Sequence, residues 1–211
     1  MDWNEVFGWS QKGFIACCAL TVQLSLSLAV GQEARNSRPI VSDQPLDAEQ
    51  LVIYRTLLVS WFQGEKAAIN LAIQTDSIPA QDDSFDKKCV RGLSLETGAA
   101  GKVHRIRPED TARLGPFEIR LVDPEAQKKE VSKNDPGKAV REGHSVDDAV
   151  RSGFAHGLLT LSEIQFDKSH THALVSFSFV CGGLCGNGTT ILLEKREGVW
   201  TQKAQCGEWV S

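Results

Sequence analysis

The sequence feature that most constrains this chain is the loop from Cys181 to Gly188, which reads CGGLCGNG and contains two cysteines and four glycines. An alternating apolar run from Ala173 to Val180 precedes it, and a β-like run from Thr189 to Leu193 follows it. Glycine at this density between two strands is typical of a turn where the backbone takes positive φ or approaches another group closely. The sequence therefore predicts a hairpin whose end is the most distinctive point of the fold.

The β pattern continues on both sides of this loop. From Ala173 to Cys181, every second side chain is apolar or cysteine, whereas Ser176 and Ser178 occupy alternate positions on the other face. Further strands are predicted at Ile164 to Phe166 and at Val199 to Cys206. Because short turns join these segments, we expect an antiparallel meander of about four strands.

Helical patterns precede the meander. Asp47 and Gln50 form a capping-box pattern, and apolar residues then recur at helical spacing as far as Trp61. Further helices are predicted from Pro108, from Asp123 to about Lys133 and from Ser145 to Gly157, and single strands at 69–73 and 117–121. The fold class that follows is α+β, with N-terminal helices packed on the C-terminal antiparallel meander.

The helix predicted from Ser145 to Gly157 carries apolar side chains at helical spacing. We expect Val146, Ala149, Val150 and Phe154 to face the core. The segment Asn134-Asp135-Pro136-Gly137, which precedes this helix, predicts a turn.

The N-terminal region has the pattern of an export signal. Residues 14–30 carry no charge and end at Ala29-Val30-Gly31, where small residues fit a signal-peptidase site. The run is short and polar for a membrane span, so we predict a cleaved signal peptide at 1–31, with an uncleaved anchor as the alternative. Residues 32–46 predict a flexible lead, and residues 47–211 a single domain in the periplasm or outside the cell.

Cysteine usage agrees with export. Of the six cysteines, two fall within the predicted signal, which leaves Cys89, Cys181, Cys185 and Cys206. An even number of cysteines in an exported chain indicates a disulfide framework. Four cysteines permit three connectivities, and the sequence does not choose among them.

The loop cysteines could also act in catalysis or bind a metal instead of forming structural disulfides. Cys185 is a candidate nucleophile for a hydrolase or a thiol-redox enzyme, with His170 or alternatively His172 as a candidate base. The spacing of Cys181 and Cys185 differs from the usual dithiol motif, and no helix follows to lower a thiol pKa. Two thiolates with a histidine also suit a soft metal such as copper, in a carrier. His170 and His172 form an H-x-H pair that suits a metal, although they lie at a predicted turn without an obvious third ligand.

Charge and motifs exclude several partners. The net charge is −4, the pI is about 5.8, and no run of lysine and arginine is present, so we expect no nucleic-acid partner. The glycine loop matches neither the dinucleotide-binding nor the P-loop pattern, and no cofactor is predicted. We expect membrane contact only through an uncleaved N-terminal segment.

The sequence predicts a disulfide-stabilised binding or interaction module rather than an enzyme, and it does not name a ligand.

Several segments together resemble a known group of proteins. These are Asp123 to Gly137, Leu161 to Ile164, Ser176 to Gly188 and the end Trp209-Val210-Ser211. They resemble uncharacterised exported bacterial proteins that carry a Cys-Gly-Gly-Leu-Cys-Gly loop and a Trp-x-Ser end. The resemblance implies a bacterial exported protein and assigns no catalytic residue. Gly198 to Trp200 is also similar to the closing hairpin of cystatin-like and NTF2-like α+β folds, a likeness of fold alone.

Overall fold

The computed structural model describes residues 40–62, 64, 67–78, 85–96 and 102–211. All of them belong to one compact unit. The predicted signal peptide and most of the predicted lead lie outside the described residues. Within the lead, however, residues 40–42 form a strand, and Leu46 is buried in the core. The packed part of the chain therefore begins before residue 47, where the sequence pattern placed the start of the domain.

The described residues form an α+β fold, as predicted. Its helices are α1 (Ala48–Phe62), α2 (Pro108–Leu114), α3 (Pro124–Lys133), α4 (Pro136–Arg141) and α5 (Val146–His156). Its strands are β1 (Ile40–Ser42), β2 (Ile69–Ala72), β3 (Lys102–His104), β4 (Ile119–Val122), β5 (Leu158–Leu161), β6 (Gln165–Phe166), β7 (His172–Gly182), β8 (Cys185–Arg196) and β9 (Val199–Val210).

Local signals set most of the helix boundaries. The Asp47 side chain accepts the N–H of Gln50 at 2.8 Å, and the Gln50 side chain accepts the N–H of Asp47 at 2.9 Å, so the predicted capping box is present. Asp123 caps α3 through the N–H of Ala126, and Ser145 caps α5 through the N–H of Asp148. The predicted turn at Asn134 to Gly137 instead begins α4, because Pro136 fits the first helical turn and Asp135 caps it.

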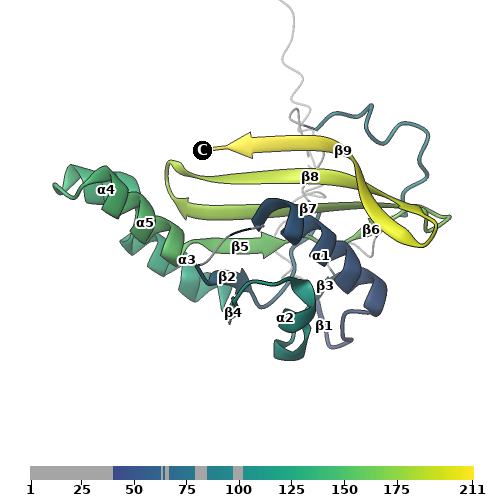
Figure 1. Ribbon diagram of the computed structural model, residues 1–211, viewed down its shortest axis with the longest axis horizontal. Coiled ribbons are helices and arrows are strands. Elements are labelled where there is room, and N and C mark those ends of the chain that lie inside the picture. Colours follow the sequence, from purple (N-terminus) through teal and green to yellow (C-terminus); the bar gives the residue numbers. More distant parts are fainter. Residues whose placement is uncertain (1–39, 63, 65–66, 79–84, 97–101) are drawn as a thin grey trace, which may run out of the picture. The chain divides into compact units, whose positions relative to one another are not determined.

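The main sheet has the strand order β4-β2-β5-β7-β8-β9, and β6 pairs with β7 (Figure 1). The strands from β5 to β9 pair in antiparallel fashion, as predicted. Strand β2, in contrast, is parallel to both β4 and β5, which the expected meander did not include. Parallel neighbours need crossover connections, and the helices α3 to α5 occupy the connection from β4 to β5.

The main core lies between α1 and one face of the sheet. Leu51, Leu57 and Leu58 of α1 are buried in one cluster with Leu71, Leu159, Val175, Phe177, Ile191 and Leu193 of the strands. The hydroxyl of Tyr54 donates to the carbonyl of Ser162 at 2.8 Å. Burial and the nearby carboxylate of Glu163 raise the pKa of Tyr54 well above its usual value, so this phenol stays neutral.

The opposite face of the sheet is covered only in part. Val131 of α3 packs on Ala72 and Leu158, and the segment 85–95 packs on Leu174 and Leu192. Between these two covers the sheet is less enclosed. Helix α1 thus covers one face of the sheet, and α3 with the segment 85–95 covers parts of the other.

Helix α5 presents its apolar residues differently from the prediction. Only Ala149 and Gly153 are buried, whereas Val146, Val150 and Phe154 are exposed. A Cβ atom on Gly153 would lie 2.4 Å from Pro136 and 3.2 Å from the carbonyl oxygen of Cys181. The small side chains therefore form the contact face, because only they allow the helix to approach α4 and β7 this closely.

Candidate functional site

The four predicted cysteines form two disulfides, Cys89–Cys206 and Cys181–Cys185. This confirms the expected disulfide framework and selects one of its three connectivities. Cys181–Cys185 closes the hairpin between β7 and β8, and Cys89–Cys206 ties the segment 85–95 to β9. In this state Cys185 carries no free thiol.

The structure does not bring Cys185 and His170 together. Cys185 begins β8 at one end of β7, whereas His170 lies just before the other end of β7. The eleven residues of β7 span about 30 Å at the usual rise of a strand. His170 instead stacks on Phe166, with ring centroids 4.7 Å apart. A nucleophile at Cys185 with His170 as its base is therefore incompatible with this geometry.

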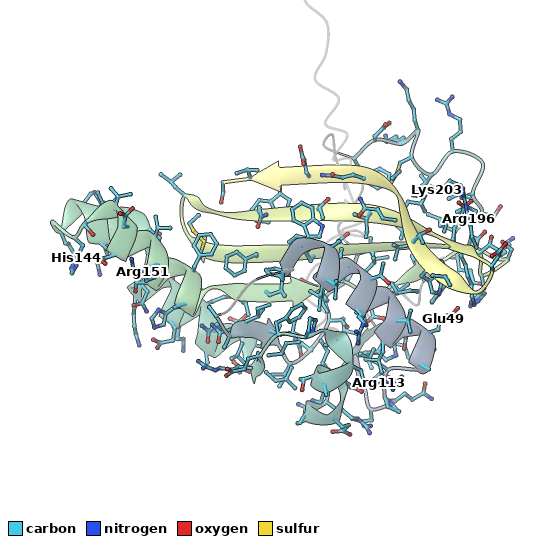
Figure 2. The ribbon with its side chains drawn as sticks, viewed as in Figure 1. Glu49, Arg113, His144, Arg151, Arg196 and Lys203 are labelled. Carbon is cyan, nitrogen blue, oxygen red and sulfur yellow. A yellow bond between two sulfur atoms is a disulfide. The ribbon has the colours of Figure 1, made fainter. Side chains whose placement is uncertain are left out.

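His172 belongs to a network of charged side chains near the β8–β9 turn. Its Nδ1 lies 3.3 Å from a carboxylate oxygen of Asp167, and its Nε2 accepts from Lys203 Nζ at 2.9 Å. Lys203 also donates to Glu194 at 3.0 Å. Figure 2 shows Lys203 and Arg196 at the end of the sheet opposite to Arg151 of α5. Within the described ranges, no group of three or more His, Cys, Asp or Glu residues is arranged to hold a metal.

Asp167 organises the turn that carries the two histidines. It accepts the Ser169 hydroxyl at 2.6 Å and the backbone N–H groups of Thr171 and His172 at 2.8 and 2.9 Å. Burial alone would raise the pKa of Asp167, but these hydrogen bonds outweigh it and hold the pKa well below its usual value. The H-x-H segment is thus fixed by a carboxylate of the protein.

Acid should weaken this turn. The pKa of Asp167 is lower in the folded state than its unfolded value of about 3.9, so its contribution is present above about pH 4 and is lost as the pH falls further. Asp167→Asn should therefore lower the free energy of unfolding more at about pH 5 than at about pH 3. Urea unfolding of both proteins at the two pH values measures this, and an equal difference at both would contradict the assignment.

A second contact between a carboxylate and a histidine occurs away from the hairpin. His104 Nδ1 lies 2.8 Å from Glu163, whose carboxylate also accepts the His104 N–H at 2.9 Å and the Thr75 hydroxyl. The pair joins β3 to the segments that follow β2 and β5. The contact therefore ties these three segments together.

An aromatic cavity of about 610 Å³ adjoins the Cys181–Cys185 disulfide. Trp61 of α1 and Phe154 of α5 contribute to its wall, and Phe177 and Phe179 of β7 also line it. The rings of Trp61 and Phe177 meet edge to face with centroids 5.1 Å apart, and those of Phe154 and Phe179 are 5.4 Å apart. Trp61 is 40% exposed and Phe154 is 54% exposed, so two rings from different helices are open to solvent beside one cavity.

A small number of polar groups also line the aromatic cavity. Asn70 Nδ2 donates to the carbonyls of Ala155 and Gly157 at 3.0 Å each, and this fixes α5 to β2. Asn187 and Arg151 are further lining residues, and Arg151 forms an exposed ion pair with Asp148 at 3.3 Å. An apolar cavity with few polar groups is the usual form of a small-molecule site.

The sequence pattern does not reveal this cavity. Trp61 and Phe154 both belong to apolar stripes, and such stripes predict core positions. The signal that would have helped is on α5, where the small residues Ala149 and Gly153 run beside the larger Val146, Val150 and Phe154. A helix that buries its small residues must expose its large ones.

Comparison of the chain with protein-family models, with curated proteins and with solved structures finds no match. Among the described helices, none is both long and apolar enough to span a bilayer.

Proposed function

We propose that this protein is an exported, disulfide-stabilised binding module that holds an apolar ligand in the aromatic cavity beside Cys181–Cys185. The observation that carries the proposal is the exposure of Trp61 and Phe154, on two different helices, beside this cavity. Large exposed apolar surface on a folded protein is usually a binding surface. The two disulfides, the signal-like N-terminus and the resemblance to exported bacterial proteins support a place in the periplasm or outside the cell.

The lining limits the chemistry of the ligand. Aromatic rings offer both dispersion contacts and edge-to-face packing, so a ligand with a flat ring or a branched apolar group fits them best. Arg151 and Asn187 supply hydrogen bonds for one polar end. We therefore expect a mostly apolar small molecule with a single polar group.

Binding of the neutral fluorescent dye N-phenyl-1-naphthylamine tests this function. The oxidised protein should enhance the fluorescence of the dye, and Trp61→Ala or Phe154→Ala should weaken the affinity at least about tenfold, because each removes one ring from the cavity. Trp209→Ala is the matched control, since Trp209 is also 40% exposed but does not line this cavity. Absence of dye binding, or equal affinity in all three variants, would rule out the aromatic cavity as the site.

A further inference from the structure

A second hollow of about 780 Å³ lies on the other face of the sheet. Ala72, Leu158, Thr160, Ser178 and Val180 of β2, β5 and β7 form its floor. Helix α3, the residues of α4 and the hairpin glycines Gly182 and Gly183 also line it. The Cys181–Cys185 hairpin therefore lies between two hollows of different character, one lined by aromatic rings and one lined by charged, hydroxyl and aliphatic side chains.

Two hydroxyl groups on this floor are free to bind a ligand. Thr160 and Ser178 are direct partners across β5 and β7, so their side chains share one face. Among the described residues, neither hydroxyl has a hydrogen-bond partner. Ser176 on the same strand differs, because its hydroxyl is bonded to that of Thr190 at 2.7 Å. A hydroxyl both donates and accepts, so the Thr160 and Ser178 pair suits a ligand that does the same.

Most charges around the hollow are already paired. Lys128 lies 2.8 Å from Glu125, and Lys138 lies 3.9 Å from Glu142. The carboxylate of Asp135 accepts the backbone N–H groups of Gly183 and of Lys138 in α4, and these bonds, with the nearby charge of Arg141, hold its pKa below the usual value. These groups therefore add little net charge to the hollow.

One cation and one anion at the hollow have no ion pair among the described residues, although Arg141 is close enough to lower the pKa of Asp135 and Asp76 accepts the N–H of Ser77 at 2.7 Å. Arg141 and Asp76 both line the hollow, and neither has an ion pair within the part of the chain that the structure describes. A phosphorylated ligand would need a surplus of cations, which the lining lacks. A ligand without net charge that carries several hydroxyl groups matches this balance.

Trp209 is not among the residues that line the hollow, but it lies two strands from Ser178 on the same face of the sheet. Trp209 pairs with Gly188 of β8, and Gly188 pairs with Ser178 of β7, so these three residues share a face. A Cβ atom on Gly188 would lie 2.2 Å from the indole Nε1, and one on Gly186 would lie 3.2 Å from the ring. The indole therefore lies directly on the glycine backbone of β8. It is 40% exposed, which leaves part of its surface to solvent.

We propose that this face binds a neutral oligosaccharide. A sugar ring has one face of C–H groups, which packs on an indole, and hydroxyl groups at its edge, which bond to Thr160, Ser178, Asp76 and Arg141. From β9 to β2 the sheet crosses four strand spacings, about 19 Å, which exceeds the size of a single sugar ring. This site is separate from the aromatic cavity and does not depend on the function proposed for it.

The test is calorimetric titration of the oxidised protein with cellotetraose, maltotetraose, mannotetraose and N-acetylated chitotetraose, at up to millimolar concentration. At least one of these should bind. Trp209→Ala should weaken that binding at least about tenfold, and the combined Thr160→Val and Ser178→Ala variant at least about fivefold. Trp61→Ala, which alters the other face, should leave it unchanged and should still lose the dye.

A further variant separates stacking from loss of the fold. Gly188→Ala keeps Trp209 but places a Cβ atom where the indole lies, so saccharide binding should fall as it does in Trp209→Ala. Circular dichroism and urea unfolding show whether each variant is folded. Failure of all four saccharides to bind, or full binding by folded Trp209→Ala, would overturn the proposal, whatever the result with the dye.

Discussion

Replacing Cys89 and Cys206 together by alanine should lower the free energy of unfolding by about 4–5 kcal/mol. The two cysteines are 117 residues apart in sequence, so their disulfide closes a long loop and restricts the unfolded chain strongly. In the folded state the same bond holds the segment 85–95 on Leu174 and Leu192, which it helps to bury. Loss of the bond therefore frees the unfolded chain and also loosens the folded state, and both effects lower the free energy of unfolding.

The matched comparison is the double variant Cys181→Ala and Cys185→Ala. These cysteines are only four residues apart, and the loop-closure relation predicts a loss of about 2 kcal/mol. Urea unfolding of the oxidised proteins measures both effects. If the short-loop variant proved the less stable of the two, chain entropy would not be the main contribution of these disulfides.

The sequence predicts the local features of this fold well. The capping box at Asp47, the caps at Asp123 and Ser145 and the long strands around the CGGLCGNG loop all depend on neighbouring residues, and all are present. The parallel pairing of β2 is different, because it depends on residues about fifty and ninety positions further along the chain. No local pattern in Ile69 to Ala72 contains that information.

The candidate sites likewise divide into features that depend on neighbouring residues and features that depend on tertiary packing. The loop predicted the end of a hairpin, and its cysteines predicted disulfides, because residue type and spacing determine both. The aromatic cavity joins α1, α5 and β7, whose relative placement is tertiary. Gly186 and Gly188 show a further limit, since their role is to admit the ring of Trp209 from the next strand. A glycine in the sequence shows that space is needed but not which group fills it.

Phe177 shows how the core and the aromatic cavity depend on each other. It is only 3% exposed, and its ring contacts Trp61 and Phe62 with centroids 5.1 and 6.0 Å away. It also lines the aromatic cavity, so the same side chain supports the fold and the site. Trp61, its partner on α1, lines the cavity but remains partly exposed.

Phe177→Ala should therefore cost about 3–5 kcal/mol of unfolding free energy, because it leaves a void in the core that the neighbouring rings fill only in part. Trp61→Ala should cost much less, since its ring is already partly hydrated, although both variants should lose the dye. Phe177→Leu is the control that keeps most of the volume and should cost less than about 1.5 kcal/mol. Chemical unfolding gives all three values. Equal losses for Phe177→Ala and Trp61→Ala would mean that Trp61 belongs to the core rather than to the wall of a binding site.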